Sequence, residues 1–545
     1  ARYRPLSLVT FALEYELFGL RPDISHFVNA LLYALTLLLV LRILVLFLPE
    51  KGNPWLSAAF AGAVLFALHP VHTEVVSNIK GRDELLALLF ALGTLYYALR
   101  HAATRHWQPL AASAVLMFLG MMSKENAITY LAVVPLAQFV LLRASWRTML
   151  RTTAILLLPV LAYLWLRVEA IGYLFKTDAP VQSLMNNPFV EATLEERMAT
   201  IIYTLGLYVK LLFFPHPLTH DYYPYHIPLM HWTDWQVWAS LALYAAMTWW
   251  AIRELPRRTV HSFAILYFLA TISIVSNIFF PVGTFMNERF LYMPSLAFPL
   301  FFGWFAFRQM PKWLEPRQPA FAKWSPLALS ALFALGFAWK SLDRIPDWRN
   351  EFTLNKAAIQ VSKNSARANT FYAYTLYRMA VDTADVKAKR QLITEAEPYV
   401  DKALSIYPQY PDALRTKAGI RALDYQLTGN LDQLLADFAE VARKDWVDFL
   451  DTYMKYLNGR APAQKLLPFY HRVGYEIFFL EKGDLAHAIQ YLQMGLELDP
   501  QNPQLLKDLA LVYARSSNAR LALQYAQAAL SANPGDEELL ELLRQ

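Results

Sequence analysis

The residues best able to do chemistry lie in one short polar stretch between two apolar segments. Residues 69–74 read His-Pro-Val-His-Thr-Glu, and residues 81–84 read Gly-Arg-Asp-Glu. The flanking segments 56–68 and 85–99 are apolar enough to lie in a membrane. Ionisable groups beside hydrocarbon are costly to bury, so they mark a functional site by default. Taken alone, this stretch suits a proton relay or a metal site.

Each of these residues also has a purely structural interpretation. His69-Pro70 can simply end a helix, because proline blocks its continuation. His69, His72 and Glu74 have the chemistry of zinc ligands, but no third histidine stands at a familiar spacing, so a divalent metal is unsupported and we predict none. Arg82 and Asp83 can form a local ion pair at a helix end.

Composition divides the chain into two parts. The 545 residues are 56% hydrophobic with a mean hydropathy of +0.25, but apolar blocks of spanning length, about 20 residues each, stop near residue 340. This pattern predicts an all-α protein: a polytopic helical membrane domain over 1–341 and a soluble helical domain over 342–545. Cysteine is absent, which excludes disulfides and thiolate metal sites. The net charge of +6 is modest and its cations lie beside membrane segments, so nucleic acid is not an expected partner.

Charge distribution predicts how the membrane domain is oriented. Four turns rich in Lys and Arg, at 100–105, 143–151, 253–258 and 308–323, are placed in the cytoplasm by the positive-inside rule. The polar loops and the soluble domain then face the other side. About ten segments are expected to span: 24–48, 54–69, 84–100, 108–122, 126–143, 150–167, 235–252, 260–280, 290–307 and 324–340.

Two segments need a separate interpretation. Residues 198–214 are apolar, yet a span there would invert the orientation of every later basic turn, so we expect a re-entrant or surface-lying helix. The chain begins at Ala1 without an initiator Met or a first anchor. Ten spans that start outside imply one further span upstream, so we expect the N-terminus to be truncated.

The soluble domain carries a helical repeat. Pro500 and Pro534 end similar segments 34 residues apart, which is the tetratricopeptide period. Small and apolar residues match at equal offsets before each proline: Ala488, Leu492 and Gly495 with Ala522, Ala526 and Ala529, and Ala396, Val400 and Ala403 before Pro408. Such repeats stack into a solenoid whose groove usually holds peptides, although a spacer that only stabilises the membrane domain is the alternative.

Further polar clusters are predicted on the same membrane face as residues 69–84. They lie at 3–6, 123–126, 220–229 and 287–295. A pocket of this kind suits group transfer from a lipid-linked donor, because arginine binds phosphate oxygens through a planar charged fork and a carboxylate can accept the acceptor proton. The candidate cations are Arg4, Arg82, Lys124 and Arg289, and the candidate acids are Glu74, Asp83, Glu125, Asp221 and Glu288.

Several of these residues also have a purely structural interpretation. Glu288 and Arg289 can be a local ion pair, and Lys124 can snorkel from a short turn to the interface. The Tyr and Trp residues of 222–238 suit an interfacial belt better than a sugar-stacking platform.

The motifs Tyr-Arg-Pro-Leu at 3–6, His-Pro-Val-His-Thr-Glu-Val-Val at 69–76, Ser-Lys-Glu at 123–125 and Glu-Arg-Phe-Leu-Tyr-Met-Pro-Ser at 288–295 resemble those of the transmembrane and tetratricopeptide-repeat O-mannosyltransferases. These are membrane glycosyltransferases of the GT-C class. Asp221-Tyr222 with 227–229, and Trp-Arg-Asn at 348–350, are similar to other family segments. The resemblance covers essentially the whole chain in the same order.

The resemblance implies an inverting transfer of mannose or a similar hexose from a polyprenyl-phosphate sugar to a protein hydroxyl, with the repeats recruiting the acceptor polypeptide. A bacterial homologue in the inner membrane is favoured, with the endoplasmic-reticulum membrane expected for a eukaryotic one, and with the repeats outside the cytoplasm. No cofactor is implied beyond the lipid-linked donor. The family's main catalytic acid precedes the Arg-Pro-Leu motif, so we expect it upstream of Ala1 and expect the fragment itself to be inactive.

These arguments combine into one assignment of roles. Arg4, Arg82 and Arg289 are predicted to hold the donor phosphate, while Glu74 and Asp83 position the sugar or support the missing base. The remaining pocket residues are His69, His72, Lys124, Glu125, Asp221, Tyr222, Glu288 and Tyr292. A non-catalytic scaffold that presents the repeats is the main rival. A transporter would need charges within several spans, whereas these charges gather at one interface.

Overall fold

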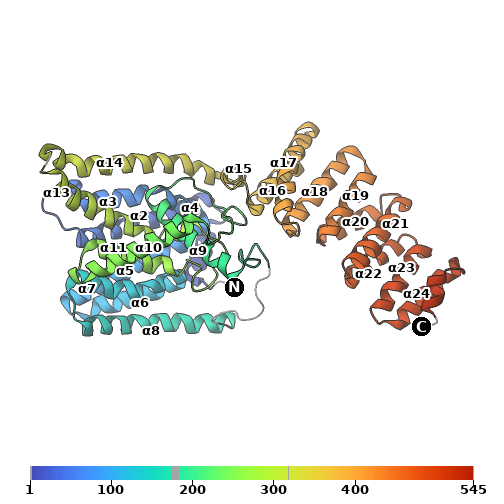
Figure 1. Cartoon of the computed structure of the whole chain (residues 1–545), viewed down its shortest axis with the longest axis horizontal. Helices are drawn as coiled ribbons and strands as arrows, with labels where there is room; N and C mark the ends of the chain where they lie inside the picture. Colours follow the sequence, from blue (N-terminus) through green and yellow to red (C-terminus); the bar gives the residue numbers. More distant parts are fainter. Residues whose placement is uncertain (1–2, 174–182, 317, 544–545) are drawn as a thin grey trace. The chain divides into compact units, whose positions relative to one another are not determined.

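The computed structural model describes residues 3–173, 183–316 and 318–543, and within them it contains helices and no strand (Figure 1). The predicted all-α class is therefore confirmed. Packing divides the chain into two compact units, Ala1–Ser362 and Lys363–Gln545. The sequence placed the boundary at 341/342, which lies within the long helix α14.

The first unit is a bundle of mostly apolar helices, with short turns between several of them. Its α-helices are α1 Pro5–Phe18, α2 Pro22–Phe47, α3 Ala58–Leu68, α4 Thr73–Ser77, α5 Arg82–Thr104, α6 Trp107–Ser123, α7 Tyr130–Leu142, α8 Trp146–Ile171, α9 Leu194–Phe213, α10 Trp235–Glu254, α11 Val260–Ser273, α12 Ala297–Trp304, α13 Met310–Leu314, α14 Pro319–Arg344 and α15 Glu351–Val361. The short turns are η1 Pro54–Leu56, η2 Pro70–His72, η3 Ile79–Gly81, η4 Glu125–Thr129, η5 Leu255–Arg257, η6 Glu288–Leu291, η7 Pro294–Leu296, η8 Phe305–Gln309 and η9 Ile345–Arg349.

Several of these helices are long and apolar enough to cross a membrane, so this is an integral membrane protein. Five qualify among the described residues, or six if the pair Ala58–Leu68 and Pro70–Ser77, bent by 48°, forms one span. The predicted count of ten is not confirmed: α6 and α11 are shorter apolar helices, and α10 and the segment 290–307 are not among the candidates. Helix α9 is not among the candidates either, and its interfacial placement stays a prediction. The five are Pro22–Phe47, Ile79–Thr104, Glu125–Leu142, Trp146–Ile171 and Pro319–Arg349.

Helix α5 is the core of this bundle. It packs against α2, α6 and α7, and 67% of its apolar window is buried inside the protein. Helix α8 lies at the outside of the bundle, with only 17% of its window buried. A helix that is apolar on all sides must be covered by protein or by lipid. Protein covers α5, whereas lipid is left to cover most of α8.

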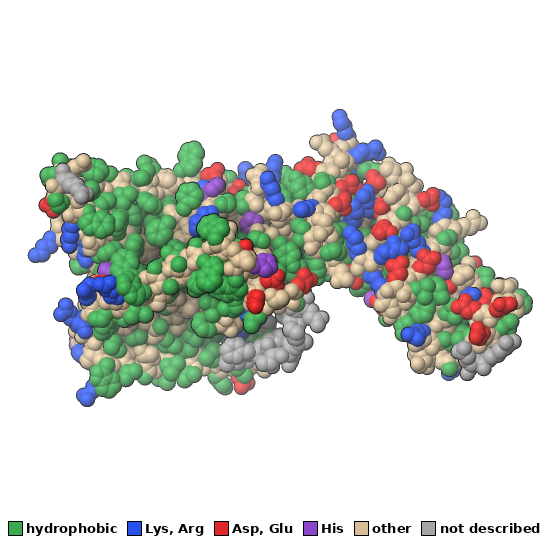
Figure 2. All heavy atoms as spheres, viewed as in Figure 1, with side chains coloured by type: hydrophobic (Ala, Val, Ile, Leu, Met, Phe, Trp, Pro, Cys, Tyr) green, Lys and Arg blue, Asp and Glu red, His purple; other side chains and the backbone are tan. Residues whose placement is uncertain are grey.

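Charged side chains are distributed unevenly over the first unit. Figure 2 shows Lys and Arg gathered at its left end, beyond a largely hydrophobic flank. The exposed Arg100, Arg143, Arg253 and Lys312 belong to the four basic turns. The membrane orientation derived from these turns stays a prediction.

The second unit consists of shorter helices that pack on their neighbours in chain order. They are α16 Ala366–Asp382, α17 Val386–Ile406, α18 Pro411–Thr428, α19 Leu431–Lys444, α20 Asp448–Asn458, α21 Ala463–His471, η10 Arg472–Glu481, α22 Leu485–Leu496, α23 Pro503–Arg515, α24 Ala519–Ala532 and α25 Glu537–Leu542.

The repeat pattern explains the packing of these short helices. The small and apolar residues that recur before Pro408, Pro500 and Pro534 are all buried. Small side chains let paired helices approach closely: a Cβ on Gly495 would press against the ring of Tyr470 and the side chain of Leu505. The assignment of these helices to tetratricopeptide repeats stays a prediction.

Candidate functional site

A tight corner between α3 and α5 presents the acidic residues of the opening motif. Pro70 begins η2, and the backbone N–H of Val71 is capped by Nδ1 of His69 at 3.4 Å. Helix α4 then carries Glu74 inward. Gly81 closes the corner, because a Cβ at this position would overlap the carbonyl oxygen of Val75. This close approach turns the chain into α5, whose first turn carries Asp83 and Glu84.

Arg4, Asp83, Glu125 and Arg167 form one ion-pair network, which we call the Arg4 cluster. Arg4 Nη1 lies 2.5 Å from Asp83 Oδ2, and Arg4 Nη2 lies 2.9 Å from Glu125 Oε2. Arg167 Nη1, from the end of α8, donates to Glu125 Oε1 at 3.1 Å. Four segments that are distant in sequence therefore meet at one point.

Glu74 and Arg289 form a second pair beside this cluster. Glu74 Oε1 accepts from Arg289 Nη1 at 2.8 Å, and Glu74 Oε2 accepts the backbone N–H of Arg289 at 3.0 Å. Glu74 is buried, whereas the Arg289 side chain is 34% exposed. The ring of Phe290 lies 5.4 Å from the Arg289 guanidinium and 6.0 Å from Lys124 Nζ, which itself pairs with Glu84. The second pair thus adjoins the segment that carries Lys124 and Glu125.

The structure places Arg82 elsewhere. Its side chain is fully buried, donates to Asn29 Oδ1 at 3.0 Å, and pairs with Glu14 at 2.7 Å. The guanidinium also lies 4.0 Å above the ring of Phe11. Arg82 therefore holds α1 and α2 against α5. Its predicted donor-phosphate role stays a prediction, and these contacts favour a packing role instead.

The two histidines are buried and act as braces. His69 Nε2 donates to the carbonyl of Leu212 at 2.9 Å, which ties the corner to the end of α9. His72 contacts Ser295 Oγ at 2.8 Å through Nε2 and Tyr33 at 2.9 Å through Nδ1. The ring of Tyr292 packs edge-on against His72 with 5.0 Å between centroids. No group of three or more His, Cys, Asp or Glu in the described ranges could hold a metal ion.

Glu288 anchors the loop that precedes α10. One carboxylate oxygen accepts the backbone N–H of Thr219 and the hydroxyl of Tyr222, the latter at 3.0 Å. Its other oxygen is buried and has no hydrogen-bond partner among the described residues. Asp221 caps the backbone N–H of Tyr223 at 3.1 Å within the same loop. Glu288, Asp221 and Tyr222 thus shape the loop at 219–223, although Glu288 is the immediate neighbour of Arg289.

Burial raises the pKa of Glu288 to about 8, while the positive charge of Arg344 opposes that shift. Because the folded pKa lies above the ordinary value of 4.5, stability from this group is full below about pH 4.5 and is lost as the pH rises toward 8. We expect Glu288→Gln to flatten this fall, since an amide oxygen can still accept from Thr219 and Tyr222. Thermal unfolding of both proteins between pH 5 and 8 tests this; equal slopes would contradict it.

Arg167 was not predicted from the sequence as a site residue, and Glu84, although part of the opening motif, was given no role. Arg167 is the one cation in the last turns of α8, at the end of the helix predicted to lie outside the cytoplasm. This position in the sequence is the feature from which a site role for Arg167 could have been predicted. Glu84 follows Asp83 directly, but only the structure shows that it turns inward to Lys124 while Asp83 turns toward Arg4.

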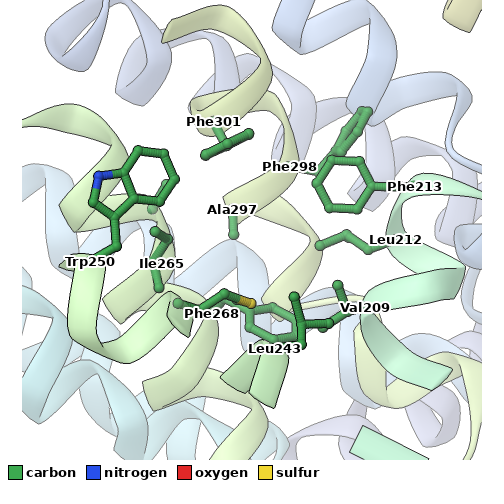
Figure 3. A pocket seen from close by; sticks show the side chains of 12 residues that line it. Val209, Leu212, Phe213, Leu243, Trp250, Ile265, Phe268, Ala297, Phe298 and Phe301 are labelled. Carbon is green, nitrogen blue, oxygen red and sulfur yellow. The ribbon is translucent and has the colours of Figure 1, made fainter. Parts of the chain in front are cut away.

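An apolar cavity of about 200 Å³ lies next to the histidine corner. Figure 3 shows Phe213 and Phe298 on one side of it and Trp250 on the other. Leu212, whose carbonyl binds His69, is part of its wall. The lining residues come from α9 to α12: Val209, Leu212, Phe213, Leu243, Met247, Trp250, Ala264, Ile265, Phe268, Ala297, Phe298 and Phe301.

Comparison with known proteins gives a consistent result. The chain is 27% identical over 564 residues to the mouse protein O-mannosyl-transferase TMTC3 and 26% identical over 577 residues to the human TMTC3. These alignments cover 94% and 96% of this chain but 58% and 60% of the relatives. Human TMTC4 is 29% identical over 426 residues, covering 67% of this chain and 54% of TMTC4.

No family model matches the chain. It spans less than two thirds of the length of the curated relatives named above. The alignments with TMTC3 nevertheless include nearly all of the sequence in which the motifs were recognised. The predicted family resemblance is therefore confirmed: over most of its length, this chain is a homologue of the TMTC-type protein O-mannosyl-transferases.

Proposed function

We propose that the complete protein is an integral-membrane glycosyltransferase that moves mannose or a similar hexose from a polyprenyl-phosphate donor to a protein hydroxyl. The observation that carries this proposal is the Arg4 cluster with its neighbour Arg289. Arginines from separate segments lie together, partly exposed, in an apolar helical bundle. Homologues over most of the chain are named protein O-mannosyl-transferases.

The donor phosphate is assigned to Arg4 and Arg289. A guanidinium binds two phosphate oxygens at once and stays charged at any pH at which the protein is folded. Glu74 forms an ion pair with Arg289, and Asp83 forms one with Arg4. Each carboxylate thereby fixes the orientation of its guanidinium. The apolar cavity beside Leu212 offers room for part of the isoprenoid chain.

The chemical step transfers the sugar with inversion. The acceptor hydroxyl gives its proton to a carboxylate base, its oxygen bonds to the anomeric carbon, and the bond from that carbon to the phosphate oxygen breaks. The products are the glycosylated protein and polyprenyl phosphate. Glu74 and Asp83 position the donor for this step or support its base.

The helical repeats are proposed to recruit the acceptor polypeptide. Their groove type usually binds peptides, and the charge pattern of the membrane unit supports a place outside the cytoplasm for them. In a bacterium this would be the inner membrane, and in a eukaryote that of the endoplasmic reticulum.

A transfer assay with the complete protein tests the proposal. Membranes containing it are supplied with a panel of polyprenyl-phosphate sugars and a Ser/Thr-containing acceptor domain. Arg289→Gln is expected to lower kcat/KM about ten- to a hundredfold, because a hydrogen bond to a charged group contributes about 1.5–3 kcal/mol. Arg100→Gln, at an exposed basic turn, is the matched control and should retain full activity.

Two outcomes would favour the rival scaffold function. One is no turnover with any donor by a correctly folded complete protein. The other is full biological function after Arg4 and Arg289 have both been replaced.

A further inference from the structure

We propose that Arg4 and Arg167 form a two-arginine anion site in which the Glu125 carboxylate occupies the place of the donor phosphate, so that Glu125 is an internal competitor of the donor. This inference rests on the proposed function for the identity of the anion. It adds Arg167 as a donor-binding residue and gives Glu125 a role distinct from that of the other acids.

The contacts of Glu125 are those expected of a bound oxyanion. Its Oε2 accepts from Arg4 Nε at 3.1 Å and lies 2.9 Å from Arg4 Nη2, while its Oε1 accepts from Arg167 Nη1 at 3.1 Å. Nε and Nη2 of Arg4 therefore bind the Glu125 carboxylate, and Nη1 binds Asp83. Phosphate presents two or more oxygens at a similar spacing, which is why arginine forks bind both groups.

The Arg4 cluster is exposed enough to solvent for another anion to replace the Glu125 carboxylate. The side chains of Arg4, Arg167 and Glu125 are 19%, 17% and 28% exposed, whereas the neighbouring Lys124 and Glu84 are 6% and 1% exposed. Replacing one anion by another leaves both guanidiniums paired. The exchange therefore avoids the penalty of stranding a buried charge.

Helix α8 holds the two arginines in place independently of Glu125. Tyr163, one turn before Arg167, donates its hydroxyl to the backbone carbonyl of Tyr3 at 3.0 Å. The rings of Tyr3 and Tyr163 also pack with their centroids 5.9 Å apart. The segment that carries Arg4 is thereby fastened to the helix that carries Arg167. Release of Glu125 from the arginines leaves this fastening intact.

The charges balance for this exchange. The Arg4 cluster is formally neutral with Glu125 in place, since two arginines face two acids. When Glu125 turns away, Arg4, Arg167 and Asp83 carry a net charge of about +1, which matches the single negative charge of a sugar-phosphate diester. Glu74 and Glu84 pair with cations outside this site, Arg289 and Lys124, while Asp83 stays on Nη1 of Arg4 and leaves the face that Glu125 occupies to the incoming anion.

Binding of a prenyl phosphate to the complete protein in lipid nanodiscs tests this inference without any sugar transfer. Farnesyl phosphate is the probe, with farnesol and inorganic phosphate as separate arms. We expect Glu125→Gln to tighten farnesyl phosphate binding about tenfold, because a neutral amide of the same size competes less well for arginine. Arg167→Gln should weaken it about tenfold, and Arg167→Lys, which keeps the charge but loses the fork, should fall between.

Arg151→Gln is the matched control, since Arg151 is an exposed arginine at the opposite end of the same helix. It should bind as the unmodified protein does, and unfolding midpoints of all variants show that the fold is retained. Unchanged or weaker binding in Glu125→Gln would overturn the internal competitor, as would unchanged binding in Arg167→Gln. Tight binding of farnesyl phosphate with no transfer from any donor would uphold this site and refute the proposed function. Equal affinity for inorganic phosphate would refute its assignment to a lipid-linked ligand.

Discussion

Replacing Lys124 by methionine is expected to destabilise the protein by about 3–5 kcal/mol, because it leaves the buried carboxylate of Glu84 without its counter-ion. Both side chains are almost completely enclosed, and Lys124 Nζ contacts Glu84 Oε1 directly. No other cation forms an ion pair with Glu84 within the described part of the chain. The unfolding midpoint of the detergent-solubilised protein is the measurement.

The double replacement Lys124→Met with Glu84→Leu is the informative control. Exchanging a buried ion pair for apolar side chains of similar volume is often neutral or stabilising. The double variant should therefore recover most of the lost stability. If the single and double variants unfold at the same midpoint, the pair does not contribute in the way its burial indicates.

Gly81→Ala is expected to lower the proposed transfer activity of the complete protein about a hundredfold. The added Cβ would overlap the carbonyl oxygen of Val75, which is backbone and cannot rotate away. Overpacking of this kind costs about 1–3 kcal/mol. The corner that presents Glu74 and Asp83 must then shift, and a displacement of about 1 Å at a reacting site can lower the rate about a hundredfold.

Gly336→Ala serves as the comparison for this variant. Gly336 lies in the middle of α14, and a Cβ there would meet nothing within 4 Å. Alanine favours a helix over glycine by up to about 1 kcal/mol, so this variant should be as stable as the parent or more so, with full transfer activity. Similar losses of stability and transfer activity in Gly81→Ala and Gly336→Ala would show that the close approach of Gly81 to Val75 is not the cause.

The sequence predicted which residues gather at the site better than it predicted what each one contacts. Hydropathy and basic turns were enough to expect Arg4, Asp83, Glu125 and Arg289 on one face, because a membrane leaves polar loops few places to lie. Arg82 shows the limit of this reasoning. It is the neighbour of Asp83, yet successive residues on a helix point about 100° apart, so one faces the site and the other faces α1 and α2.

Residues that act through tertiary contacts were the hardest to predict. Arg167 belongs to the site because α8 packs beside the segment of Tyr3, and no local pattern encodes that contact. The all-α class followed from the apolar blocks of spanning length, and the buried repeat positions followed from the 34-residue spacing. The number of spans did not, since hydrophobic blocks such as those of α6 and α11 form helices too short to qualify.

The difference in burial between α5 and α8 also governs how this protein can diverge. A change of volume on most of α5 disturbs protein neighbours, because this helix packs against α2, α6 and α7. On the outer face of α8, one lipid-facing residue can replace another with little effect, as long as it stays apolar. Neutral substitutions should therefore accumulate along α8 but not in its last turns. There Tyr163 binds the backbone of Tyr3, and Arg167 binds Glu125.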